Sequence, residues 1–230
     1  MDSAQGSTNW RKLIAFTLPM AVFILLLGAT GVLRNAEGSF WQSAPEYWIY
    51  PLQTIVCGAL LLWFWRDYEF STPRQIVLAL LIGVVVCGLW IAPQQFFGFE
   101  ARRVGFDVDV FRDQPALYWS TVSLRFLRLV VVVPLIEEIF WRGFLLRYLV
   151  NERFSAVPFG TFSWISFAVV TLAFGFSHSR ADWVVAIVTG ALYNIVAYRS
   201  KSLASCVIAH ATTNLLLGAW IMATKQWGFW

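Results

Sequence analysis

The chain has 230 residues, of which 59% are hydrophobic and only 13% are charged, and its mean hydropathy is +0.65. Soluble domains carry about 25% charged residues, so this composition excludes an ordinary soluble fold and indicates an integral membrane protein. The net charge of +4 comes from basic residues scattered near the ends of apolar segments, which excludes nucleic acid as an expected partner.

Seven apolar segments follow one another along the chain, and a helix needs about 20 such residues to cross the hydrocarbon core of a bilayer. In chain order they are residues 13–33, 47–65, 75–91, 118–149, 159–177, 182–198 and 202–223. We therefore predict an all-α fold, with residues 1–230 forming a single integral membrane domain. Its expected architecture is a bundle of about seven transmembrane helices, with the lipid bilayer as its surroundings and a polar cavity inside the membrane.

The basic residues at the start of the chain predict a cytoplasmic N-terminus. Arg11 and Lys12 precede the first segment, and loops enriched in Lys and Arg stay on the cytoplasmic side. The first segment is too long for the apolar part of a cleavable signal peptide, and no small-residue cleavage site follows it. We expect it to remain as a helix.

Two adjacent acids, Glu137 and Glu138, lie in the fourth segment, where the surrounding sequence is apolar. A charged residue at the centre of a membrane helix costs about 2.5–3.5 kcal/mol on insertion scales, so such residues are usually functional. Arg142 follows Glu138 by four residues and shares its helix face, which predicts an ion pair between them. Glu137 is left without a partner on its own helix.

Pro134 precedes the two acids and cannot donate a hydrogen bond to the carbonyl of Val130. The resulting distortion favours a hydrated space in which Glu137 acts as a general base. The alternative is that Glu137 caps the freed backbone or pairs with Arg125 or Arg128.

The chain has two histidines, and each belongs to a pair of residues four positions apart on one helix face. Phe174 and His178 end the fifth segment, whereas His210 and Asn214 lie in the middle of the seventh. Taken alone, each histidine is also explained as a polar side chain that hydrogen-bonds to a neighbouring helix.

Glu137, His178, His210 and Asn214 together provide a carboxylate, two imidazoles and an amide. If these groups converge, they can activate water and donate hydrogen bonds to an oxyanion, which favours peptide hydrolysis. A nucleophilic serine is not supported, because no G-x-S-x-G motif is present. Glu137 lies roughly 18 Å from the inner end of its helix and His178 at the outer end of another, so we expect the turn 177–182 to dip into the membrane.

At these residues the chain resembles the CPBP family of prokaryotic CAAX-protease and bacteriocin-processing proteins. The resemblance depends on three motifs in order, within a core of residues 118–223: Glu137-Glu138-x-x-x-Arg142, Phe174-x-x-x-His178 and His210-x-x-x-Asn214. The N-terminal half also resembles the exosortase-associated subgroup labelled CAAX prenyl protease-related. That likeness implies the inner membrane of a Gram-negative bacterium.

The resemblance implies a glutamate-dependent intramembrane endopeptidase that acts on a membrane-associated peptide or protein. It makes Glu137 the general base, assisted by His178, and makes His210 and Asn214 the oxyanion hole. The supporting residues that it implies are Glu138, Arg142 and Phe174. No cofactor is expected.

Two alternatives remain. Glu137, His178 and His210 could ligate zinc with water in an open fourth position, although the H-E-x-x-H motif is absent. The chain could also be a non-catalytic immunity or scaffold protein that keeps the fold, and a transporter is a weaker third possibility because it too needs intramembrane charges.

Overall fold

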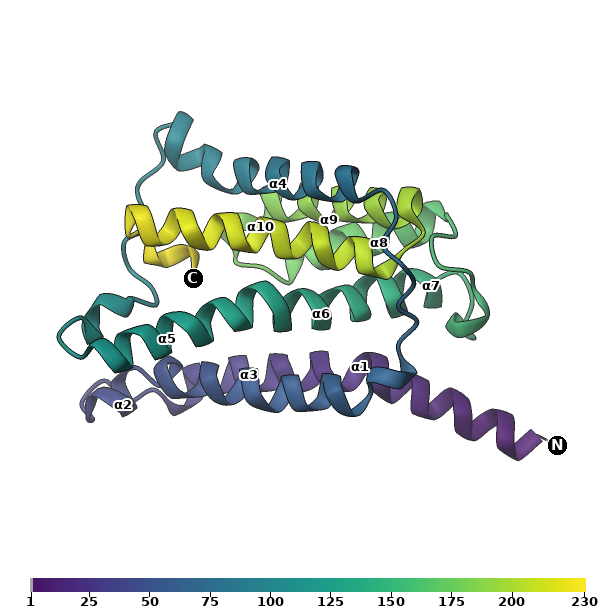
Figure 1. Cartoon of the computed structure of the whole chain (residues 1–230), viewed down its shortest axis with the longest axis horizontal. Helices are drawn as coiled ribbons and strands as arrows, with labels where there is room; N and C mark the ends of the chain where they lie inside the picture. Colours follow the sequence, from purple (N-terminus) through teal and green to yellow (C-terminus); the bar gives the residue numbers. More distant parts are fainter. Residues whose placement is uncertain (1) are drawn as a thin grey trace.

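The computed structural model describes the backbone of residues 2–230 and the side chains of residues 10–230, and this part of the chain is helical without strands. The α-helices are α1 (Asp2–Leu33), α2 (Phe40–Ser43), α3 (Glu46–Trp63), α4 (Ile76–Phe96), α5 (Pro115–Leu127), α6 (Val133–Glu138), α7 (Leu146–Tyr148), α8 (Trp164–Phe176), α9 (Trp183–Ser200) and α10 (Leu203–Thr224). The predicted all-α class is confirmed. Each of the seven apolar segments coincides with a helical stretch, and α5, α6 and α7 together form the fourth (Figure 1).

Four of these stretches are long and apolar enough to cross a membrane on length and composition alone: Trp10–Leu33, Ile76–Phe96, Arg180–Ser200 and Leu203–Thr224. A fifth, Trp164–Phe176, is apolar but shorter. The α5–α7 stretch is long as well, but charged residues of the candidate site interrupt its apolar sequence.

The helices lie roughly parallel in layers (Figure 1). α1 and α3 pack side by side, the α5–α7 stretch runs through the centre, and α10 lies next to it with α8 and α9 behind. α4 packs on the outer side of α10. The start of α1 and the end of the chain lie toward opposite ends of the bundle (Figure 1).

Some charged and polar side chains are buried and many large apolar side chains are exposed, unlike in most soluble proteins. Several strongly polar side chains have no exposed surface, namely Gln53, Glu138, Arg142 and Asn194. Large apolar side chains face outward instead, and Leu62 and Val184 are 76% and 77% exposed. An apolar exterior with polar groups paired inside is the arrangement that a lipid environment favours.

A proline within α1 shows how this bundle satisfies its backbone. Pro19 has no N–H to donate to the carbonyl of Ala15. The Tyr68 hydroxyl, from the linker after α3, donates to that carbonyl at 3.1 Å. An unpaired carbonyl in hydrocarbon costs several kcal/mol, so a side chain from another segment permits the proline in a membrane helix.

Small residues allow the helices of the α8–α9 pair to approach closely. A Cβ atom at Gly175 would lie 2.2 Å from Cγ1 of Ile187 and 3.1 Å from its Cα, so a larger residue would separate the two helices. Small residues serve this purpose in membrane helix pairs generally. This contact fixes the start of α9 against the end of α8, where His178 follows.

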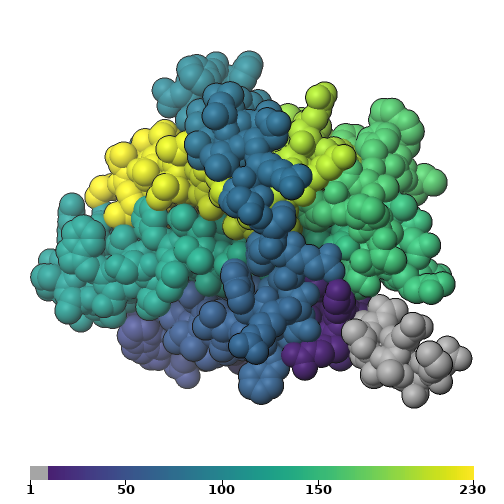
Figure 2. Space-filling view, turned by 45° about the vertical axis from the view of Figure 1, so that its right-hand side comes forward, coloured from purple at the N-terminus to yellow at the C-terminus, as the bar shows by residue number. Residues whose placement is uncertain are grey.

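Polar contacts fix the linker between α3 and α4 to the rest of the bundle. Glu69 accepts hydrogen bonds from Lys12 and Arg147, each at 2.9 Å, and thereby joins α1 to α7. Ser205 at the start of α10 donates to the Arg74 carbonyl at 2.6 Å. In Figure 2 the linker and α4, in blue, cross the visible face from the α1–α3 layer at the bottom to the upper edge of the molecule.

Candidate active site

The helix that carries the two acids changes its hydrogen-bond register around them. The α-helical turn that ends in Glu137 and Glu138 lies between two π-helical segments, Arg128–Val132 and Ile139–Leu145. π-Helical turns are uncommon and occur frequently at functional sites. They widen the helix on both sides of the acids.

This register extends the expectation about Pro134 to a second carbonyl. The N–H of Val133 donates to the carbonyl of Arg128, five residues back, so the next N–H in the same register would belong to Pro134 and reach Leu129. The proline therefore leaves the Leu129 carbonyl without this donor, in addition to the Val130 carbonyl expected from α-helical spacing. Asn214 of α10 donates its Nδ2 to the Leu129 carbonyl at 2.7 Å.

Glu138 forms the ion pair expected from its spacing. Its Oε1 accepts from Nη1 of Arg142 at 3.1 Å, and both side chains are fully buried. The same oxygen lies 2.9 Å from Nδ1 of His210. Glu138 therefore joins the helix of the acids to α10, a contact that helical spacing alone does not predict.

Arg142 connects this pair to α9. Its Nε donates to Oδ1 of Asn194 and its Nη2 to the Gly190 carbonyl, both at 3.1 Å. The guanidinium also lies over the rings of Phe174 and Tyr193, with centroid distances of 4.9 and 5.4 Å. All three nitrogens of the guanidinium are thus occupied, and Arg142 holds three helices in one arrangement.

The contact with Glu138 determines which nitrogen of His210 carries a proton. Glu138 already accepts from Arg142, so it is an ionised acceptor, and the facing Nδ1 of His210 must be the donor. In the neutral ring Nε2 then has no proton and acts as an acceptor. It can donate a hydrogen bond only when the imidazole is doubly protonated.

In His178, as in His210, Nδ1 is the ring nitrogen that has a hydrogen-bond partner. Its Nδ1 lies 2.8 Å from the carbonyl of Phe174, which only accepts, so Nδ1 carries the proton. The ring is tilted against those of Phe174 and Trp90, at 4.9 and 5.6 Å. Nε2 is therefore available as an acceptor or base.

One cavity of about 540 Å³ brings the candidate residues together. Its walls include the four residues for which the family likeness implies catalytic roles, Glu137, His178, His210 and Asn214, and the supporting Phe174. The turn after α8 therefore lines the same space as the middle of the central helix.

Glu137 is the free member of the acid pair. It is half-buried, and within residues 10–230 it has neither a hydrogen-bond partner nor an ion-pair partner. The expected alternative pairing is absent in that part of the chain, because Arg128 donates instead to Gln53 and Arg125 lies among aromatic rings. The carboxylate of Glu137 faces the cavity without competition from protein donors.

Several contributors to the site are missed by the motif analysis. They are polar or aromatic residues of other helices that orient the motif side chains: Gln53, Thr171, Tyr193 and Asn194. Asn194 donates to Thr171 at 3.1 Å while it accepts from Arg142. A single amide within an apolar segment is the signal that could have identified Gln53 and Asn194.

The residues named for the zinc alternative share the cavity, but they form no compact set of ligands. Among residues 10–230, no three His, Cys, Asp or Glu side chains are close enough together to hold a metal ion. Nδ1 of each histidine is already occupied by Glu138 or by a backbone carbonyl.

Comparison with known proteins identifies one family. Residues 119–216 match the family described as type II CAAX prenyl endopeptidase Rce1-like. Neither a curated protein nor a solved structure matches the chain. The matched region contains all three motifs. This match confirms the resemblance to the CPBP family, and residues 119–216 are the part of the chain that is similar to the Rce1-like endopeptidases.

Proposed function

We propose that the protein is a glutamate-dependent intramembrane endopeptidase, in which Glu137 and His178 activate a water molecule. The observation that carries this proposal is the division of labour between the adjacent acids. Glu138 is bonded to Arg142 and His210, whereas Glu137 faces the cavity without a partner in the described part of the chain. A general base must be free to take a proton from the nucleophile.

The reaction begins when Glu137 accepts a proton from water while Nε2 of His178 accepts its second hydrogen bond. The water oxygen bonds to the carbonyl carbon of the substrate, and the carbonyl electron pair moves to its oxygen. Nε2–H of the doubly protonated His210 and the second N–H of the Asn214 amide donate to this oxyanion. Collapse of the intermediate breaks the C–N bond, and Glu137 returns its proton to the leaving nitrogen.

The test compares protein N-termini in membranes of native cells that produce the wild type, Glu137→Gln or Glu37→Gln. Glu37 is an exposed acid far from the motifs in sequence and is the matched control. We expect Glu137→Gln to reduce processing by a factor of about 10²–10⁴, the usual contribution of a general base. Unchanged processing in Glu137→Gln cells would reject the protease mechanism and favour the scaffold or immunity alternative.

The same purified protein distinguishes metal-free hydrolysis from the zinc alternative. We expect activity to survive exhaustive chelation and the metal content to be far below one ion per chain. Loss of activity on chelation with recovery on adding zinc would instead assign Glu137, His178 and His210 as ligands.

We further propose that the protein lies in the bacterial inner membrane beside exosortase systems, with its N-terminus in the cytoplasm, and that it acts on a membrane-associated peptide or protein. The basic residues before the first span support this orientation. With seven crossings the C-terminus lies outside, so alkaline phosphatase fused after Trp230 is expected to be active. An inactive fusion at normal expression would reverse the orientation.

A further inference from the structure

One guanidinium at the candidate site has no carboxylate to neutralise it. Arg128 begins the first π-helical segment and is 5% exposed. Its Nε donates to Oε1 of Gln53 at 2.7 Å, but among residues 10–230 neither of its Nη atoms has a hydrogen-bond or ion-pair partner. Buried charges in proteins are normally paired, so this arrangement requires an explanation.

The protein holds Arg128 firmly in this position. Nε2 of Gln53 donates to the Phe23 carbonyl at 2.6 Å, which fixes the amide so that its oxygen faces Arg128. The guanidinium carbon lies 4.4 Å from the ring centroid of Tyr50 and 5.1 Å from that of Phe23. With Nε occupied, the free edge consists of Nη1 and Nη2, which is the edge that binds a carboxylate through two parallel hydrogen bonds.

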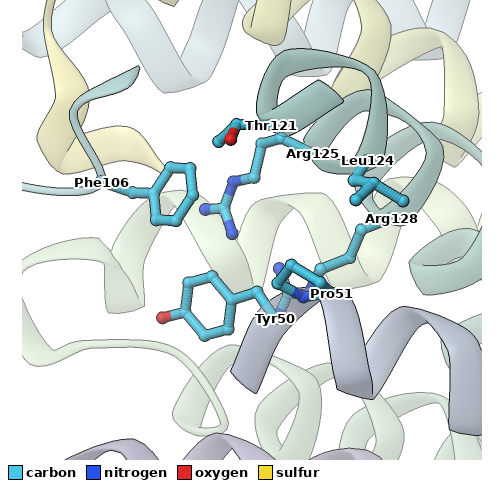
Figure 3. Close-up of a pocket in the computed structure, with 7 residues that line it drawn as sticks. All are labelled: Tyr50, Pro51, Phe106, Thr121, Leu124, Arg125 and Arg128. Carbon is cyan, nitrogen blue, oxygen red and sulfur yellow. The ribbon is translucent and has the colours of Figure 1, made fainter. Parts of the chain in front are cut away.

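The location of this edge distinguishes Arg128 from its neighbour. Arg128 lines the 540 Å³ cavity together with Glu137, and the charge of Glu137 acts on it without a direct ion pair. Arg125 lies one turn earlier, and its guanidinium is enclosed between Phe106 and Tyr50 (Figure 3). Arg125 borders a small space of about 10 Å³ that Arg128 also lines, but Arg125 is not among the residues that line the 540 Å³ cavity.

We propose that Arg128 is a substrate-binding residue that docks a carboxylate of the peptide beside the scissile bond. The proposal rests on the proposed protease function. The residues that α1 contributes to the cavity wall, Met20, Phe23, Ile24 and Leu27, are all apolar, and the ring of Phe23 packs against Arg128. The favoured substrate is therefore an apolar peptide with one carboxylate close to the cleaved bond, provided either by an acidic side chain or by a free chain end.

Binding is measured first, on Glu137→Gln in lipid nanodiscs, so that hydrolysis does not interfere. The probes are three mixtures of apolar octapeptides with randomised Ala, Leu and Val. One is neutral with a C-terminal amide, the second has one internal Glu and the amide, and the third is neutral with a free carboxylate. A charged hydrogen-bonded pair corresponds to a preference of about tenfold or more, so we expect at least one carboxylate mixture to bind that much tighter than the neutral one. The tighter of the two identifies the source of the carboxylate.

The variants identify the residue responsible. Arg128→Gln in the same background is expected to reduce the preference to less than about twofold. Arg128→Lys, which keeps the charge and protects folding, is expected to retain only part of it. Arg125→Gln removes a buried guanidinium one turn away and should leave the preference unchanged. Equal binding of all three mixtures, or a preference that survives Arg128→Gln or disappears in Arg125→Gln, would overturn the proposal.

Hydrolysis of the same mixtures by the protein with Glu137 intact separates this proposal from the proposed function. Carboxylate preference without cleavage of any mixture would count against the protease and leave the binding residue in place. Cleavage that proceeds equally on all three mixtures would support the protease and reject the role of Arg128.

Discussion

Replacement of Arg142 by Met is expected to destabilise the protein severely while preserving the length of the side chain. The substitution removes the ion pair with Glu138 and the hydrogen bonds to Asn194 and Gly190, all within the fully buried centre of the bundle. Glu138 then retains only its contact with His210.

The size of the effect follows from what remains behind. Removing one partner of a buried ion pair costs about 3–5 kcal/mol, because the other charge stays buried. Each acceptor left without a donor costs about 1–3 kcal/mol. Some repacking will reduce these costs, so we expect the free energy of unfolding to fall by at least about 4 kcal/mol in the Arg142→Met variant.

The measurement is reversible unfolding of the purified protein by SDS in mixed micelles, followed by the fluorescence of its 13 tryptophans. Arg34→Met is the control, because the Arg34–Glu46 pair lies at the surface with the arginine side chain 49% exposed. Such pairs contribute about 0–1 kcal/mol. The double variant Arg142→Met with Glu138→Gln should recover part of the loss, since it removes the uncompensated charge.

Two results would refute this reasoning. One is an Arg142→Met variant no less stable than Arg34→Met, which would mean that the buried pair contributes little. The other is a double variant whose loss equals or exceeds the sum of the two single losses. That result would show that the charge left on Glu138 is not the cause.

Three further predictions concern packing, backbone satisfaction and pH. Gly175→Ala should lower the free energy of unfolding by about 1–3 kcal/mol because the added methyl group would meet α9. Gly28→Ala is the control and should have no such effect, since Gly28 has open space around it. Equal effects of the two substitutions in the same unfolding assay would exclude the contact as the cause. Asn214→Leu should cost about 1–3 kcal/mol by leaving the partly buried Leu129 carbonyl unpaired, and a neutral result would contradict that pairing. Partial burial acts to raise the pKa of Glu69, but two basic partners outweigh it and lower the pKa below its ordinary value of 4.5. The stability from Glu69 is therefore complete above pH 4.5 and lost as the pH falls through the lowered pKa. Glu69→Gln should flatten the acid limb of the unfolding curve, and an unchanged limb would exclude this group.

The helical segments could be predicted well because their signal is local. Apolar runs of spanning length occupy the same stretches as the observed helices, and the Glu138–Arg142 pair follows from positions four apart. The register around Pro134 could not be predicted in this way. The π-helical turns depend on what other helices offer to the freed backbone, and Asn214 provides that contact from the other end of the sequence.

The candidate site likewise depends on residue types, which the sequence shows, and on contacts between helices, which the sequence does not show. Residue type and motif order indicated that Glu137 and His178 belong together, although simple topology put them at different depths. Their common cavity depends on the turn after α8, whose position is fixed by packing between helices. The free edge of Arg128 likewise depends on Gln53, a residue that no motif includes.

The sequence alone determined that this is a helical membrane protein, which family region it carries and which polar residues are candidates for chemistry. These properties depend on composition and on spacing along one helix. The tertiary structure alone decided which acid is bound and which is free, because Glu138 meets His210 of α10 as well as Arg142 while Glu137 meets the cavity. Such partners are brought together by the packing of segments remote in sequence.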